Sequence, residues 1–167
     1  MRRAAAALCL VVYAALGGCK PAPAALTAAD RTAAHAMDSA WSAGVAAGDM
    51  SAMMAGYASD AIVQPPSMPA MRGTDAIRQF YQAMTSAKVT ITLAQETADG
   101  AGDFMYTTGR YHYQQMPAGP SEDGKYLEVF RRGADGKWTL VAESWSPNAP
   151  AAPAPAAKPA APAARAK

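Results

Sequence analysis

The order of the sequence periods predicts an α+β fold, in which three N-terminal helices pack on one face of a cone-shaped, curved antiparallel sheet. Apolar residues first recur at helical spacing, between residues 27 and 57 and again after residue 73. After residue 88 the period changes to two, and long alternating segments run to residue 146. The stretch Gly-Ala-Asp-Gly at 133–136 predicts a hairpin between the last two strands.

The helices are expected where capping residues precede apolar stripes. Thr27, with Asp30 three residues later, predicts a capping box, and Gly48 ends this first helix. Asp49 is expected to cap a short second helix, and Thr74 to cap a third. The apolar stripes are Ala34, Met37, Trp41 and Val45 in the first helix, Met53, Met54 and Tyr57 in the second, and Ile77, Phe80, Tyr81 and Met84 in the third.

The strands are expected from alternation and from their breakers. A turn at 58–60 leads into a short strand at 61–63. The two prolines at 65–66 end this strand, because neither can donate a hydrogen bond to a neighbouring strand. Val89, Ile91 and Leu93 alternate with threonines, as in a strand with one buried face. The segments 125–132 and 137–146 form the final hairpin. In the segment 103–115 the residues expected on one face are Met105, Thr107, Gly109, Tyr111 and Tyr113.

The N-terminal residues 1–18 have the pattern of a signal peptide: two arginines, then an apolar stretch too short to span a bilayer. The stretch ends in Leu-Gly-Gly-Cys, which resembles a bacterial lipobox and predicts a lipid on Cys19. Residues 19–25 are then a short linker. Position 20 is Lys20 and not the aspartate that commonly retains Gram-negative lipoproteins at the inner membrane, so the lipobox resemblance implies the outer membrane, facing the periplasm, as the location. The alternative is an ordinary signal peptide with an incidental cysteine.

The C-terminal residues 147–167 consist mainly of proline and alanine. Such a segment cannot bury enough apolar surface to offset its ordering entropy, so we expect a disordered tail. The domain itself is expected at 26–146. It holds nine basic and all thirteen acidic residues, and this acidic balance argues against nucleic-acid binding.

Three stretches carry a resemblance to a known superfamily: WSAGVAAGDM, YASDAIVQPPSMPAMRGTDAIRQFY and DGKYLEVFRRGADGKWTLVAESW. They are similar to the nuclear transport factor 2-like superfamily, in particular to its SnoaL-like and ketosteroid-isomerase-like domains of unknown function. The resemblance implies a cystatin-like roll with a cavity between sheet and helices, and often a homodimer through the outer sheet face. It says little about activity, because this fold hosts enzymes, binding proteins and dimerisation modules.

The resemblance also argues against steroid isomerisation. Pro65 matches the position of that family's aspartate base, and proline has no titratable group. Trp41 matches the oxyanion-hole tyrosine and can donate only through its indole N–H. Glu128 matches the second oxyanion-hole acid, so one of three roles is retained.

Two carboxylates of the final hairpin remain as candidate catalytic residues. If the hairpin closes symmetrically around 133–136, Glu128 faces Val141 and Glu143 faces Tyr126. Both carboxylates then lie on one sheet face as diagonal neighbours, about 7–8 Å apart. Carboxylates among aromatic residues tend to have raised pKa values and could act as acid and base. The alternative is that an arginine pairs with one of them, or that water reaches the face.

The side chains expected to line a ligand pocket are mostly aromatic: Trp41, Tyr57, Gln64, Tyr111, Tyr113, Tyr126, Phe130 and Trp145. We expect no cofactor, and no metal site either, because the two histidines are far apart and no cysteine remains in the domain. Methionine thioethers could bind Cu(I), but methionines more often fill cores.

These observations favour a lipid-anchored periplasmic protein whose cavity binds a small, largely apolar ligand without turnover. One alternative is an isomerase- or lyase-type enzyme using Glu128 and Glu143. The other is an envelope interaction module that forms a homodimer.

Overall fold

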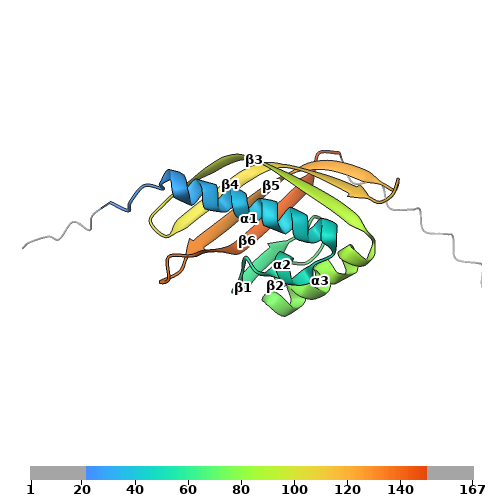
Figure 1. Cartoon of the computed structure of the whole chain (residues 1–167), viewed down its shortest axis with the longest axis horizontal. Coiled ribbons are helices and arrows are strands. Elements are labelled where there is room, and N and C mark those ends of the chain that lie inside the picture. The colour runs from blue at the N-terminus through green and yellow to red at the C-terminus, as the bar shows by residue number, and fades with distance from the viewer. Residues whose placement is uncertain (1–21, 150–167) are drawn as a thin grey trace, which may run out of the picture.

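A computed structural model describes residues 22–149 of the chain (Figure 1). The expected signal peptide, Cys19, and residues 150–167 of the expected tail lie outside the described residues. Within them the elements follow in the order three helices around a short strand pair, then four long strands. No helix in the part that is described is long and apolar enough to cross a membrane.

The first two helices begin at the expected caps. In α1 (Ala28–Ala47), the Thr27 hydroxyl accepts a hydrogen bond from the Asp30 amide at 3.2 Å, and the Asp30 carboxylate accepts one from the Thr27 amide at 2.8 Å. This confirms the capping box. Gly48 ends the helix at a φ of 68°, a left-handed conformation that glycine adopts without strain. Asp49 caps α2 (Met50–Met54) through the amides of the next turn.

The third helix begins differently from the prediction. Its cap is Gly73, and Thr74 is the first residue of α3 (Thr74–Ser86). Gly73 has a φ of 80°, and its amide donates to the Ala61 carbonyl at 2.9 Å. The glycine thereby turns the chain sharply from the strand pair into the helix, and no side chain caps it.

Six strands form one mixed sheet in the order β2-β1-β6-β5-β4-β3. They are β1 (Tyr57–Gln64), β2 (Met71–Arg72), β3 (Val89–Ala101), β4 (Phe104–Gln115), β5 (Ser121–Arg132) and β6 (Trp138–Pro147). The antiparallel meander β3 to β6 confirms the prediction, whereas β1 runs parallel to β6. The predicted turn at 58–60 is wrong, because these residues belong to β1, and the two-residue strand β2 was not predicted.

The final hairpin closes in a register that differs from the prediction. Arg132 pairs with Trp138, so the loop is one residue longer than a symmetric closure around 133–136. A bulge between Val129 and Phe130 shifts the pairing by one more residue, and Glu128 therefore faces Glu143 instead of Val141. Because side chains alternate with a period of two, the two single shifts together leave both carboxylates on the same face.

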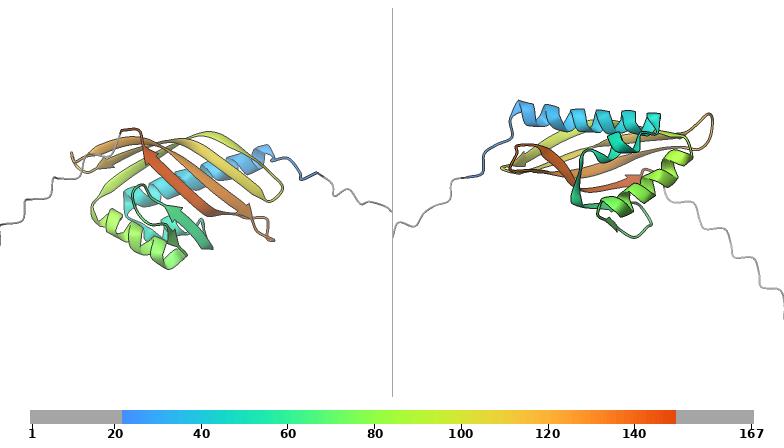
Figure 2. Two further views of the ribbon diagram at one scale, coloured as in Figure 1. Left: turned by 180° about the vertical axis from the view of Figure 1, so that it is seen from behind. Right: turned by 60° about the horizontal axis from the view of Figure 1, so that its bottom comes forward.

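The helices cover one face of the curved sheet, and α1 lies along this face (Figure 2). Trp138 and Arg132 attach its N-terminus to the final hairpin, because both side chains donate to the Asp30 carboxylate, at 3.1 and 2.9 Å. The Arg132 guanidinium also lies 4.4 Å from the centre of the Trp138 ring. The two contacts with Asp30 tie the N-terminal end of α1 to β5 and β6, the strands that carry the candidate carboxylates.

Candidate functional site

A cavity of about 650 Å³ lies between the sheet and α3. Its volume falls in the range of small-molecule sites, and most of its wall is apolar or aromatic. The residues around it come from α1, α3, the loop after β1, and the strands β3 to β6. They are Trp41, Pro65, Pro66, Met68, Phe80, Tyr81, Ala83, Met84, Ile91, Leu93, Tyr111, Tyr113, Pro120, Ser121, Glu122, Tyr126, Glu128, Glu143, Ser144 and Trp145.

Two tyrosine–glycine pairs shape the sheet side of the cavity. Tyr111 on β4 is directly opposite Gly124 on β5, and Gly109 on β4 is directly opposite Tyr126 on β5. A Cβ atom on Gly124 would lie 2.2 Å from the Tyr111 ring, and one on Gly109 would lie 2.7 Å from the Tyr126 ring. Each ring therefore lies across a glycine, and only glycine leaves room for it there.

Glu143 lies on the sheet wall of the cavity and is held by two tyrosines. Its Oε1 accepts a hydrogen bond from the Tyr57 hydroxyl at 3.0 Å and another from the Tyr81 hydroxyl. Burial raises the pKa of Glu143 to about 7. The two tyrosine hydrogen bonds lower this pKa, and the charge of the nearby Asp38 raises it. The pKa values of both tyrosines lie well above 10 because the rings are buried, so both hydroxyls remain donors.

Glu128 lies opposite Glu143 and interacts with a third carboxyl group. The Thr107 hydroxyl donates to Glu128 Oε2 at 2.8 Å. Burial and the charges of Asp38 and Glu143 raise the pKa of Glu128 well above its ordinary value. Burial also raises the pKa of Asp38, although hydrogen bonds from Tyr126, at 2.9 Å, and from Glu128 oppose this. The hydrogen bond between the two groups raises the pKa of Glu128 and lowers that of Asp38, so Glu128 is the member of this pair that holds a proton more tightly.

A second cavity of about 330 Å³ lies between α1, α2 and the sheet. Trp41 and Glu128 line both cavities, so these two side chains separate them. Tyr57 and Phe130, expected in the ligand pocket, line the second cavity instead. Gln64 lines neither cavity and is exposed at the end of β1, so the structure does not place it in a pocket. The other predicted residues, Tyr111, Tyr113, Tyr126 and Trp145, line the larger cavity.

The sequence analysis missed Asp38 and the roles of Tyr81 and Thr107. Asp38 is 5% exposed and follows Ala34 by four residues, so it lies on the buried stripe of α1. A charged residue within an apolar helical stripe is the signal that could have found it. Tyr81 was expected as an apolar stripe residue, but a tyrosine in a buried position normally finds a partner for its hydroxyl.

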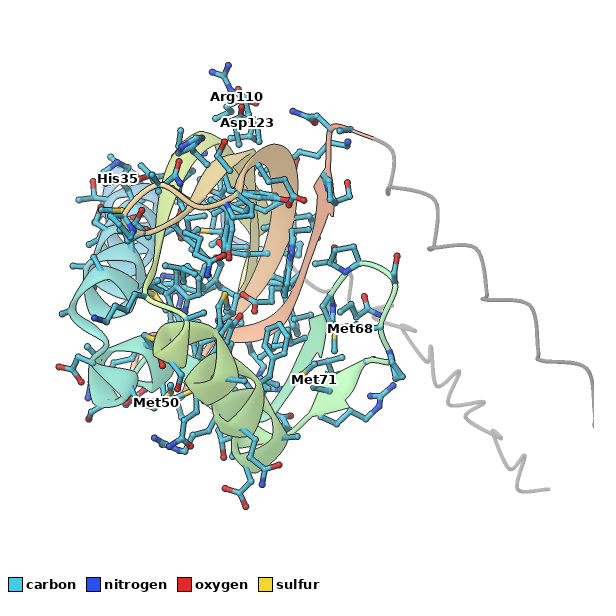
Figure 3. The ribbon with its side chains drawn as sticks, turned by 90° about the vertical axis from the view of Figure 1, so that its right-hand side faces the viewer. His35, Met50, Met68, Met71, Arg110 and Asp123 are labelled. Atoms are coloured by element: carbon cyan, nitrogen blue, oxygen red, sulfur yellow. The ribbon has the colours of Figure 1, made fainter. Side chains whose placement is uncertain are left out.

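No group of three His, Cys, Asp or Glu side chains in residues 22–149 has the arrangement of a metal site. Figure 3 shows His35 on the outer side of α1, and Met50 far from Met68 and Met71. The methionine thioethers considered for Cu(I) are therefore not gathered at one place. His112, on the outer face of β4, contacts Asp123 at 2.8 Å.

The comparisons with known proteins decide the family. A sequence profile of the SnoaL-like domain matches residues 39–141. This chain belongs to the SnoaL-like domain family. No curated protein matches the SnoaL-like chain.

Solved structures confirm the fold of this SnoaL-like domain. An NTF2-like protein of unknown function from Pseudomonas putida KT2440 is similar with a TM-score of 0.65 and 19% identity, over 72% of this chain and 88% of the other. A protein of unknown function with a cystatin-like fold from Nostoc punctiforme PCC 73102 has a TM-score of 0.63 and 18% identity, over 77% and 97%. A ketosteroid isomerase-like protein from Erwinia carotovora atroseptica SCRI1043 has a TM-score of 0.59 and 19% identity, over 71% and 96%.

The structure brings together the three positions that the resemblance to steroid isomerases singled out. Pro65, Trp41 and Glu128 all line the larger cavity of the SnoaL-like domain. Pro65 follows β1 directly and offers no proton acceptor. The carboxyl groups in the wall of this cavity are Glu122, Glu128 and Glu143, and Asp38 lies behind Glu128.

Proposed function

We propose that this SnoaL-like protein is a lipid-anchored protein of the cell envelope, facing the periplasm, whose larger cavity binds a small, largely apolar ligand without turnover. The observation that carries the proposal is the cavity of about 650 Å³ with its aromatic and aliphatic wall. A domain serving only as an interaction module would gain stability by filling this space with side chains.

The apolar wall has contributions from both layers of the fold. Phe80 packs against Tyr81 and Trp145, with ring centroids 5.1 and 6.0 Å apart, and Trp41 contacts Tyr81 edge-on at 5.5 Å. These contacts fix the rings in place, so the cavity is largely preformed. Preformed apolar sites bind ligands without the cost of ordering their own side chains.

A neutral hydrophobic dye tests the binding function. We expect Nile red to bind the purified full-length protein saturably at one site per chain, with a rise in fluorescence. Ala83→Trp, which places a large ring in the wall of the cavity, should weaken the binding at least about tenfold. The matched control is Ala87→Trp, at the exposed end of the same helix and outside the cavity. Equal affinity in both variants, or no saturable binding, would contradict the proposal.

The membrane anchor has a separate test. Acyl chains on Cys19 would supply the membrane affinity. Cys19→Ser should therefore move the protein from the membrane pellet to the soluble or unprocessed fraction of the cells. If the serine variant remains in the membrane pellet at the wild-type level, the anchor is not Cys19.

An acid–base enzyme of the isomerase or lyase type is the second candidate, and Glu143 favours it. A carboxyl group with a pKa of about 7 can take up and release protons near neutral pH. With Pro65 at the position of the steroid isomerase base, we expect no isomerisation of a β,γ-unsaturated ketosteroid. Solvent deuterium incorporation into bound ketones, present in the wild type and lost in Glu143→Gln, would favour the enzyme over the binding protein.

A further inference from the structure

The wall of the larger cavity has charges of only one sign. Three of its residues are acidic: Glu122 at the rim, and Glu128 and Glu143 inside. No lysine, arginine or histidine side chain of the described residues lines it. The arginines that bind carboxylates within the described residues, Arg110 with Glu96, Arg131 with Asp60 and Arg132 with Asp30, contact acids outside the cavity. The cavity is therefore unsuited to anions.

One carboxylate oxygen in this wall accepts no hydrogen bond from residues 22–149. Glu143 is 8% exposed, and its Oε1 takes both tyrosine hydroxyl hydrogen bonds. Within the described part of the chain, its Oε2 accepts no hydrogen bond. This oxygen also does not belong to the fully buried polar atoms there that lack a partner, so it keeps some exposed surface. Glu143 lines the cavity, so Oε2 is the oxygen of this carboxylate that is left to meet a ligand there. A buried carboxylate oxygen without a partner is costly, and a ligand can supply the missing donor or charge.

Aromatic side chains line the same cavity as this oxygen. The cavity wall includes Trp41, Phe80, Tyr81, Tyr113 and Trp145. The π faces of such rings attract organic cations, and cages of aromatic rings with an acid are the usual site for alkylated ammonium groups. A neutral apolar ligand would use the rings but leave Glu143 Oε2 unpaired.

We propose that the ligand of this cavity is an organic cation, a protonated or quaternary amine on an apolar body, whose charge lies against Glu143 Oε2. This inference rests on the proposed binding function and adds the chemical class of the ligand. It follows that cation binding and protonation of Glu143 compete.

The groups that face Glu143 from each neighbouring element determine the pH dependence. They are Tyr57 from β1, Tyr81 from α3, Asp38 from α1 and Glu128 from β5. The charge of His35 lowers the pKa of Asp38. The pKa values of the tyrosines lie well above 10, and Glu143 has a pKa of about 7, so the charge of Glu143 changes between pH 6 and 8. Its deprotonation should strengthen cation binding about tenfold over this range.

The test compares benzyltrimethylammonium with its neutral carbon isostere, neopentylbenzene, by competition against Nile red on the full-length protein. At pH 8 we expect the cation to bind at least about tenfold more tightly than the isostere. Only the cation should bind more weakly at pH 6. A quaternary ammonium cannot lose a proton, so the pH dependence reports the protein. Benzyldimethylamine, measured in parallel, shows whether a protonated tertiary amine binds equally well.

Variants separate the charge of Glu143 from the shape of the cavity. Glu143→Gln should weaken binding of the cation much more than binding of neopentylbenzene, so that the preference for the cation is lost. Glu96→Gln is the matched control, because that exposed carboxylate binds Arg110 outside the cavity. If Glu143→Gln does not fold, the wild-type comparison of the two probes across pH decides alone. Equal affinities for both probes would overturn the inference and leave the proposed binding function intact. Failure of Nile red and both probes to bind would overturn both.

Discussion

Glu128 and Glu143 lie directly opposite each other on neighbouring antiparallel strands, and both side chains are more than nine-tenths buried. Like charges in this position destabilise a sheet, and burial adds a desolvation cost for each. The two carboxyls reduce this cost in different ways: the pKa of Glu128 is raised well above its ordinary value beside Asp38, and Glu143 receives two tyrosine hydrogen bonds. The pair therefore supplies two carboxyls with raised pKa values, of which Glu143 titrates at about 7.

The first prediction concerns the interaction between these two groups. In carboxyl-carbon NMR titrations of the wild type, Glu128 should titrate well above 4.5 and Glu143 at about 7. Glu143→Gln removes a negative neighbour, so the pKa of Glu128 should fall. Glu96→Gln, an exposed control, should leave it unchanged. An ordinary Glu128 titration in the wild type would show that water or a cation reaches this carboxyl.

The second prediction is a loss of stability as the pH rises toward neutral. The pKa of Glu143 is raised from 4.5 to about 7, so the folded chain binds this proton more tightly than the unfolded chain. The resulting stabilisation is complete below pH 4.5 and is lost as the pH rises through 7, by an amount on the order of 3 kcal/mol. Urea unfolding across this range measures it.

Two other acids act in the opposite direction, but in a different pH window. Hydrogen bonds lower the pKa values of Asp30 and Asp60, so their contribution is present above pH 3.8 and is lost only as the pH falls further. Between pH 4.5 and 7 the slope of the free energy of unfolding against pH should therefore come mainly from the buried carboxyls. Glu143→Gln should flatten the slope, and an unchanged slope in this variant would assign it to other groups.

The third prediction concerns Tyr81. Its hydroxyl donates to Glu143 Oε1, so Tyr81→Phe removes a hydrogen bond that favours the carboxylate. The pKa of Glu143 should rise above 7, and the free energy of unfolding at pH 8 should fall by about 1–3 kcal/mol. Tyr113→Phe is the control, because that hydroxyl makes no hydrogen bond within residues 22–149. Equal effects of the two variants on the Glu143 titration would refute this role of Tyr81.

The fourth prediction concerns Gly124, beneath the Tyr111 ring. A Cβ atom there would lie 2.2 Å from the ring and 2.5 Å from the Ser146 carbonyl oxygen. Gly124→Ala should displace the ring into the cavity, with a stability loss of about 1–3 kcal/mol and severalfold weaker Nile red binding. Gly119→Ala is the comparison, since the atoms nearest to its Cβ, at 2.9–3.2 Å, belong to the Gln115 side chain, and neither residue lines the cavity. Wild-type dye affinity in Gly124→Ala would show that the ring does not set the cavity shape.

Local signals predicted most of the fold. Thr27 and Asp30 form the capping box that their spacing indicated, and alternation in β4 predicted which residues face the helices. The errors arose where distant segments decide local structure. Residues 58–60 have turn chemistry, but they lie within β1 because Tyr57 before them and Ile62 after them pair with β6. The Gly56 carbonyl also accepts a hydrogen bond from the Leu140 amide at 2.8 Å. No local pattern indicates such a parallel pairing.

The candidate site was predicted in part, for a similar reason. Aromatic residues and carboxylates on one strand face indicated a pocket, and five of the eight expected pocket residues line the larger cavity. The bulge near Phe130 was not readable from the sequence, and it determines that Glu128 and Glu143 meet directly. Asp38 comes from a helix about ninety residues earlier, so its contact with Glu128 depends on tertiary packing alone.

Native mass spectrometry of the protein extracted from the cells that make it tests the central claim, a cavity with a bound small ligand, most directly. We expect one small molecule per chain, released on collisional activation and absent from Ala83→Trp. Its mass and fragmentation should identify an apolar body with an amine or ammonium group. A folded wild-type protein that shows only the mass of the chain, before and after activation, would contradict the claim.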